Sequence, residues 1–137
     1  KLRAASGIML TLLFIGMLTL AFNIQPVKAS GTIYIRADGN IDPPTANITS
    51  TDNVTYYFND NNYDSIVVER DNIAIDGSGY TVQGIGSVGI DLSYRNNVTL
   101  KNVEVTNFSN GIYLYSSSNN IVARRGGQGT KNGSPSG

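Results

Sequence analysis

Apolar and polar residues alternate over short stretches between residues 65 and 122. The alternation is clear at Ile73 and Ile75, and again at Val98 and Leu100. A period of two predicts β-strands that bury one face. Strands of about four to six residues are separated here by Gly, Asn, Asp and Ser, which leaves no room for the helical crossovers of a βαβ fold. The pattern predicts an all-β domain.

The same stretch of chain repeats itself. Residues 70–75 (RDNIAI), 95–100 (RNNVTL) and 118–122 (SNNIV) align at spacings of 25 and 23. A second register relates residues 89–92 (GIDL) to residues 111–114 (GIYL), 22 positions later. Such a period is typical of architectures in which each repeat stacks on its neighbours. With three short strands per repeat, the sequence predicts a right-handed parallel β-helix with rungs over residues 65–122.

Asparagine recurs in phase with these strands. Asn72, Asn97 and Asn120 each stand just before a strand. Asn tolerates a left-handed backbone, and its amide can pair with the same residue one rung away. We therefore expect a structural asparagine ladder of these three residues. The alternative is that they only mark exposed turns.

The segments that flank the rungs do not follow the repeat. Residues 30–64 contain a double proline and an aromatic run, and the terminal unit of a solenoid is atypical because it covers the open end. We interpret these residues as an N-terminal cap, with Tyr56 and Phe58 over the apolar end. Residues 123–137 show no strand or helix pattern, so they are interpreted as a disordered or artefactual tail that truncates the last rung.

Residues 1–29 have the pattern of a secretory signal peptide. Two basic residues precede an apolar run of 15 residues at 8–22, and small side chains at Val27 and Ala29 match a cleavage site. A membrane-spanning helix needs about 20 apolar residues. We expect cleavage after Ala29 and a secreted or cell-surface protein. A retained membrane anchor is the alternative.

Composition excludes several classes of partner and cofactor. Loss of Lys1, Arg3 and Lys28 with the signal would leave 7 basic and 10 acidic residues, a net charge of −3, so nucleic acid is not an expected partner. The chain has no Cys and no His, and its two Met residues, Met9 and Met17, lie in the signal. Copper sites use these residue types, so no copper site is expected.

Calcium is a weaker candidate cofactor. Residues 60–64 (DNNYD) carry carboxylate or amide oxygens at alternate positions, and Asp71 falls at the twelfth position of the same loop. The sixth position is Ser65, where an EF-hand loop has Gly, and strand patterns flank the loop instead of helices. A solvated polar turn is the favoured interpretation, and we assign no metal ligand.

No catalytic pair of carboxylates emerges from the repeat. Glycoside hydrolysis needs two such groups held close together. Asp76 begins a tight-turn signature, Asp-Gly-Ser-Gly. Asp91 has Val67 and Tyr113 at the equivalent positions of the neighbouring rungs, and neither is acidic. We assign no catalytic residue.

Sugar binding is a more specific possibility. Alternation turns Tyr113 and Tyr115 outward on one strand, about 6.8 Å apart, a separation suited to stacking on successive sugar rings. Together with Asp91 on the neighbouring rung, these tyrosines are the candidate ligand-binding residues. The alternative is that tyrosine occurs there because aromatic residues suit strands.

Five Asn-x-Ser/Thr sequons permit glycosylation of an exported chain. The candidate acceptors are Asn47, Asn53 and Asn107. Asn97 also begins a sequon, but the ladder would bury its amide, and Asn132 lies in the expected tail.

Residues 32–39 (TIYIRADG), 64–73 (DSIVVERDNI), 75–80 (IDGSGY) and 111–114 (GIYL) resemble archaeal surface proteins with right-handed β-helix repeats. These are grouped as NosD-type or pectin-lyase-like proteins. The resemblance spans residues 30–122 and implies the fold. It implies no single function, because members include polysaccharide lyases, glycoside hydrolases, adhesins and accessory proteins of copper-enzyme assembly.

The leading hypothesis is a non-catalytic exported or cell-surface β-helix module that contacts carbohydrate or surface-layer components. One alternative is a polysaccharide lyase or glycoside hydrolase whose catalytic rungs lie beyond this fragment. The other is a NosD-like maturation factor for a copper enzyme.

Overall fold

A computed structural model describes residues 31–124 and Met9. The expected signal peptide, its cleavage site and nearly all of the expected tail lie outside the described residues. Residues 31–124 contain ten strands and no helix. In the described part of the chain, no helix is long and apolar enough to cross a membrane.

The strands form two sheets of five, in the orders β2-β1-β5-β7-β9 and β10-β8-β6-β4-β3. Except for the two-residue strands β2 and β3, neighbouring strands in both sheets are parallel. The strands are β1 (Thr32–Ile35), β2 (Ile41–Asp42), β3 (Ile48–Thr49), β4 (Thr55–Phe58), β5 (Ser65–Val68), β6 (Ile73–Asp76), β7 (Thr81–Asp91), β8 (Val98–Lys101), β9 (Glu104–Tyr113) and β10 (Ile121–Ala123).

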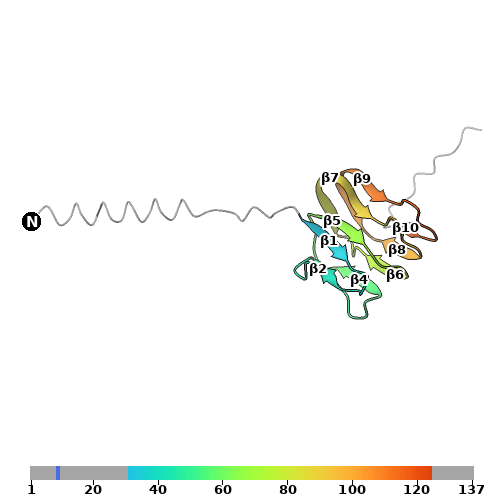
Figure 1. The fold of residues 1–137 in the computed structure, drawn as a ribbon. Coiled ribbons are helices and arrows are strands. Elements are labelled where there is room, and N and C mark those ends of the chain that lie inside the picture. The colour runs from blue at the N-terminus through green and yellow to red at the C-terminus, as the bar shows by residue number, and fades with distance from the viewer. Residues whose placement is uncertain (1–8, 10–30, 125–137) are drawn as a thin grey trace, which may run out of the picture.

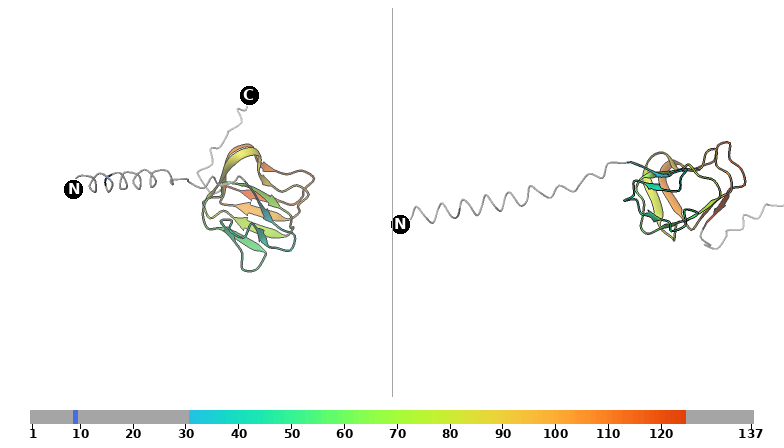
Figure 2. Two further views of the ribbon diagram at one scale, coloured as in Figure 1. Left: turned by 60° about the vertical axis from the view of Figure 1, so that its left-hand side comes forward. Right: turned by 60° about the horizontal axis from the view of Figure 1, so that its bottom comes forward.

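From β4 onward, successive strands along the chain alternate between the two sheets, so the chain winds as a β-solenoid of about 3 turns. Figure 1 shows β4, β6, β8 and β10 stacked in order, and Figure 2 shows the same stack from two other sides. The parallel β-helix predicted from the repeat is confirmed. The second and third strands expected in each rung run together as one long strand, β7 or β9, whose pairing is irregular between Gln83 and Gly86.

The core consists of inward side chains stacked in columns. In one sheet, the register places Ile33, Ile66, Ile90 and Ile112 above one another. The first three are at most 3% exposed. Burying each such side chain contributes about 1.5 to 3 kcal/mol. The columns therefore both hold the rungs together and fix which rung position faces inward.

The opposite sheet has a matching column of Tyr56, Ile75, Leu100 and Val122. Tyr56 is fully buried, and its hydroxyl donates a hydrogen bond of 2.8 Å to the backbone carbonyl of Gly39. This bond supplies the partner that a buried tyrosine hydroxyl needs. An aromatic residue can thus occupy the first position of an otherwise aliphatic column.

The segment interpreted as a cap contains a rung of its own. Strands β1 and β4 pair in parallel with β5 and β6, as any rung would. The covering elements are β2 and β3, which pair antiparallel with the outer edges of β1 and β4. Both sheets are therefore closed at this end by a short strand of opposite direction.

The third repeat is one residue out of its predicted register. Alignment of the asparagines placed Ile121 level with Val98, but β10 pairs Ile121 with Thr99 and Val122 with Leu100, a spacing of 22. A shift of one residue exchanges the two faces of a strand. Ile121 accordingly faces outward and is 58% exposed. The second register, from Ile90 to Ile112, has the same spacing of 22, so the whole rung is shorter than the one before it.

This shift breaks the expected asparagine ladder after its first step. Asn97 Nδ2 donates to Asn72 Oδ1 at 2.9 Å, and both residues are exposed, not buried. Asn120 instead donates to the carbonyl of Arg95 at 3.0 Å and accepts from the amide of Val98 at 2.8 Å. The prediction that Asn120 continues the ladder was wrong, because register places Asn119 level with Asn97. Asn72, Asn97 and Asn119 all have φ between 54° and 58°.

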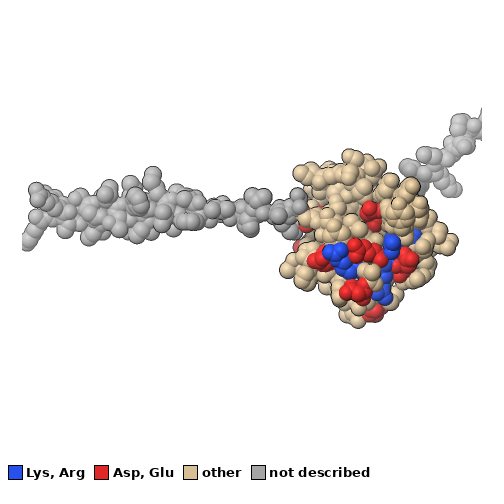
Figure 3. All heavy atoms as spheres, in the orientation of Figure 1, with Lys and Arg blue, Asp and Glu red and all other residues tan. Residues whose placement is uncertain are grey.

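Charged side chains link neighbouring rungs at the surface. Arg36 bridges Asp42 and Glu69, and Arg95 lies 3.5 Å from Asp71. Figure 3 shows acidic and basic side chains interleaved on one face of the molecule. Because these groups are substantially exposed, each pair contributes little stability. Their main effect is to favour one register of the turns.

Asp76 is the best enclosed of these carboxylates. It accepts hydrogen bonds from the Ser78 amide at 2.9 Å and from Asn102 Nδ2 at 3.0 Å, and it lies 3.2 Å from Lys101 Nζ. Burial acts to raise the pKa of Asp76, but these three partners together outweigh it and hold the pKa below its usual value. Two of the partners belong to the next rung, so the charged form of Asp76 stabilises the stack.

Replacement of Asn97 separates the effect of its backbone from that of its side-chain bond. Asn97→Ala loses the bond to Asn72 and places alanine at a left-handed φ, so we expect the free energy of unfolding to fall by about 1 to 2 kcal/mol. Asn97→Gly loses the same bond but accepts that conformation, so it should retain more stability. Urea denaturation measures both, with Asn59→Ala as the control, because Asn59 is exposed and lies outside the asparagine contacts between rungs. Equal losses in the two Asn97 variants would contradict this.

The lowered pKa of Asp76 predicts a loss of stability in acid. Its contribution is complete above the unfolded-state pKa of 3.8 and is lost as the pH falls through the lower folded-state pKa. Asp76→Asn should reduce the free energy of unfolding at neutral pH by about 1 to 3 kcal/mol and flatten its decline in acid. Urea melts from neutral pH to about pH 2 measure this. Asp60→Asn, which removes an exposed carboxylate, is the control; a decline as steep in Asp76→Asn as in the parent protein would contradict the assignment.

Candidate functional site

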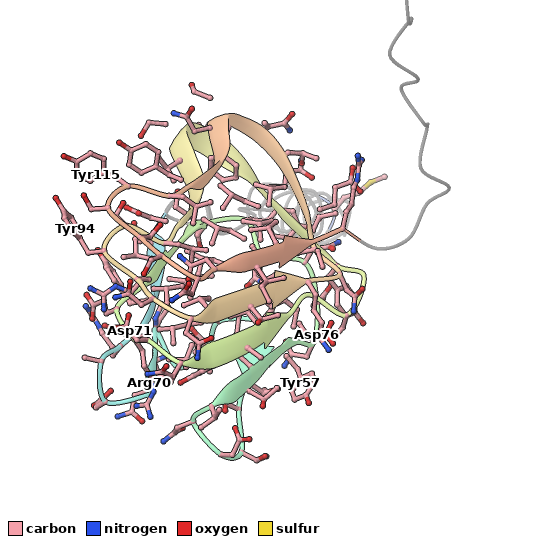
Figure 4. The ribbon with its side chains drawn as sticks, turned by 90° about the vertical axis from the view of Figure 1, so that its right-hand side faces the viewer. Tyr57, Arg70, Asp71, Asp76, Tyr94 and Tyr115 are labelled. Atoms are coloured by element: carbon pink, nitrogen blue, oxygen red, sulfur yellow. The ribbon has the colours of Figure 1, made fainter. Side chains whose placement is uncertain are left out.

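Three exposed tyrosines gather where the last two rungs turn. Tyr113 ends β9, Tyr115 follows two residues later, and Tyr94 comes from the equivalent turn of the preceding rung. Their exposed fractions lie between 42% and 59%. Figure 4 shows Tyr94 and Tyr115 together at one corner of the solenoid. We call these three residues the tyrosine cluster.

The rings of the tyrosine cluster have defined relative orientations. Tyr113 and Tyr115 are parallel, with 6.4 Å between ring centroids and an interplanar angle of 6°. Tyr94 meets Tyr115 edge to face, with 5.6 Å between centroids and an angle of 85°. Contacts of this kind are each worth about 0.5 to 1.5 kcal/mol. They hold two parallel aromatic rings at the surface.

Backbone hydrogen bonds fix the cluster to the stack. The amide of Tyr94 donates to the carbonyl of Tyr115 at 2.8 Å, and the amide of Leu92 donates to the carbonyl of Tyr113 at 2.9 Å. The rings are therefore carried by consecutive turns at a fixed height. Little ordering of the backbone is needed when a ligand contacts them.

The alternation in the sequence indicates Tyr113 and Tyr115 but not Tyr94. Tyr94 lies outside a strand, with φ of 60°, so period-two alternation does not describe it. A spacing of 22 places Tyr94 level with Ser116, which also has a left-handed φ, of 49°. Applying that spacing to the turns as well as the strands would have placed Tyr94 beside Tyr115.

Asp91 lies beside the tyrosine cluster, with a carboxylate already engaged. Its register partners are Val67 and Tyr113. One carboxylate oxygen accepts from the Ser93 amide at 2.8 Å and from the Ser93 hydroxyl at 2.5 Å. Such a bond two residues ahead is typical of an Asx-turn. Asp91 therefore holds the turn that carries Tyr94, which is an indirect role at the site.

The carboxylates in the loop at residues 60–71 accept hydrogen bonds from three different backbone amides and do not converge on one point. Asp60 accepts from the Asn61 amide at 2.7 Å, and Asp64 accepts from the Gly31 amide at 2.9 Å. Asp71 accepts from the Asn96 amide at 3.1 Å on the next rung. Among the described residues, no three His, Cys, Asp or Glu side chains are grouped as ligands for a metal ion.

The three candidate glycosylation sites differ in access. Asn53 and Asn107 are exposed. Asn47 is half-buried, and its Nδ2 donates to the carbonyl of Asn61 at 2.6 Å. Since Nδ2 is the atom that carries a glycan, modification of Asn47 would break this bond.

A surface hollow of about 380 Å³ lies away from the tyrosine cluster, along the irregular part of β7 and β9. Gly84 lines this hollow and packs closely against Phe108. A Cβ at position 84 would stand only 2.7 Å from the Phe108 ring, so a larger residue would force the ring to move. No pattern in the sequence indicates this hollow. Its lining includes Tyr63, Asp64, Gln83, Asn107 and Phe108.

No protein-family model, curated protein or solved structure matches this chain. The expected resemblance to archaeal surface proteins therefore receives support only for the parallel β-helix fold, which the structure shows directly.

Proposed function

We propose that the chain is a non-catalytic β-helix module that binds carbohydrate through the tyrosine cluster. The observation that supports this most is the parallel pair of exposed rings, Tyr113 and Tyr115, on a backbone that the rungs hold in place. Aromatic side chains combine a large apolar area with a polar hydroxyl. They suit the apolar faces and hydroxyl rims of sugar rings.

The distance between the rings fits a linear glycan. β9 ends at Tyr113 and Tyr115 lies just beyond it, but the ring centroids are 6.4 Å apart. This distance is close to the repeat of about 6.8 Å between residues two apart on a strand. A chain lying across both rings would contact each with a different part. Asp91, the third predicted ligand-binding residue, supports the site through the Ser93 turn.

An enzyme is less well supported. Asp91 has no acidic register partner on either adjoining rung, and its carboxylate is bonded to Ser93. A second carboxylate is what glycoside hydrolysis would require. A copper-maturation role has no supporting ligand set, because the described residues contain no Cys or His and their only Met is Met9. Export, and a place at the cell surface, remain part of the proposal.

A glycan array screened with the exported protein, followed by titration of the best oligosaccharide, tests this function. Isothermal titration calorimetry measures the affinity, because five of the eight tyrosines lie outside the cluster and would dilute a change of tyrosine fluorescence at the site. We expect Tyr113→Ala and Tyr115→Ala each to weaken binding about tenfold, as the loss of about 1.4 kcal/mol of stacking would.

Tyr57→Ala is the matched control. Tyr57 is 48% exposed, like the cluster tyrosines, but it lies on β4 at the opposite side of the molecule (Figure 4). Binding in this variant should equal that of the parent protein. An array without any bound glycan, or equal weakening by all three substitutions, would refute the proposal.

A further inference from the structure

The hollow beside Phe108 borders an asparagine side chain that the fold does not use. Asn107 lines this hollow and is exposed, and within residues 31–124 its carboxamide makes no hydrogen bond. Asn107 has a left-handed φ of 65° and lies where the register between β7 and β9 shifts. Such irregularities re-aim side chains and interrupt pairing. The carboxamide of Asn107 is therefore available for another role.

The other sequon asparagines within residues 31–124 have side chains that the fold does use. Asn47 Nδ2 donates to a backbone carbonyl at 2.6 Å, and Asn97 Nδ2 donates to a side chain of the neighbouring rung at 2.9 Å. The side chain of Asn53 packs against the backbone of Gly39, where an added Cβ would stand 2.6 Å from the Asn53 Cβ. Of these four carboxamides, that of Asn107 is the one on which no contact of the fold depends.

The hydroxyl of the Asn107 sequon is accessible as well. The third position of a sequon must be Ser or Thr, and here it is Ser109, which is exposed. In the Asn53 sequon the third position is Thr55, whose side chain hydrogen-bonds to Asp52. Both ends of the Asn107 sequon thus lie open at the surface.

The hollow next to Asn107 has a lining that suits a sugar ring. Phe108 and Tyr63 provide aromatic surface, and Asp64 and Gln83 provide polar groups. Asp64 is oriented by a backbone amide that donates to its Oδ1 at 2.9 Å. Aromatic surface with a few placed polar groups is typical of small-ligand sites. Because none of the described residues that line the hollow is Lys or Arg, it suits a sugar without an anionic group.

We propose that Asn107 carries an N-linked glycan whose first sugar, an uncharged one, lies in the hollow against Phe108. The donor is a lipid-phosphate-linked oligosaccharide. Asn107 Nδ2 forms a bond to the anomeric carbon of the first sugar, while the bond from that carbon to the donor's phosphate oxygen breaks. The nitrogen loses one proton, and the lipid phosphate leaves. This inference rests on export, which is part of the proposed function, and does not involve the tyrosine cluster.

Mass spectrometry of the exported protein from its native host tests the modification. Cleavage after Lys101 and Arg124 releases residues 102–124, in which Asn107 begins the one sequon. We expect this peptide to carry the added mass of a glycan whose innermost sugar is neutral. Asn107→Gln should remove that mass, and the control Asn53→Gln should retain it. An exported chain with Asn107 unmodified, or with an anionic innermost sugar, would overturn the inference and leave export intact; a chain recovered only inside the cell would overturn both.

Nuclear Overhauser spectra of the glycosylated protein test where the first sugar lies. We expect contacts between its ring protons and the aromatic protons of Phe108. Tyr57, exposed at the opposite side of the molecule, is the control and should show none (Figure 4). A glycan on Asn107 without contacts to Phe108 would overturn the placement in the hollow.

Discussion

Stacking of inward aliphatic side chains in register is the interaction on which the rest of this structure depends. Each rung is too short to bury its own apolar face, so it is stable only against its neighbours. Ile75 and Leu100 are almost completely buried because each has a rung on both sides. Within residues 31–124, Val122 has a rung on one side only and is half exposed. The core therefore extends along the solenoid axis, and its exposure is set by the order of the rungs.

Polar groups at the surface select the register that the core requires. Asn97 bonds to Asn72, and Arg95 bonds to the carbonyl of Glu69, both across a rung boundary. Hydrogen bonds and ion pairs at exposed positions add little net stability. Each of them, however, is satisfied in one register and lost when a strand slips by one residue. The tyrosine cluster depends on the same stacking, because its rings come from two consecutive turns.

The sequence was sufficient to predict the fold, because period-two alternation and the repeat report the same inward columns. It was insufficient for the third repeat. Asn119 and Asn120 are adjacent and chemically identical, so alignment could not tell which of them follows Asn97. The structure distinguishes them by backbone conformation: Asn119 has the left-handed φ, and Asn120 bonds to the carbonyl of Arg95.

The candidate site was predictable along β9 and in the two residues that follow it, where the alternation of the strand continues to Tyr115. Tyr113 follows from alternation, whereas Tyr94 sits in a turn, where the direction of a side chain depends on φ and not on parity. The hollow beside Phe108 depends on the irregular pairing of β7 with β9, which no pattern of residue types displays.

Methyl contacts in the core provide the most direct test of in-register stacking. Nuclear Overhauser spectra of a methyl-labelled protein would show which aliphatic residues touch. Stacking in the observed register predicts contacts from Leu100 to both Ile75 and Val122, and none from Ile121 to Leu100. Contacts between Ile121 and the inward residues, with Val122 facing solvent, would contradict the stacking on which the solenoid and its tyrosine cluster rest.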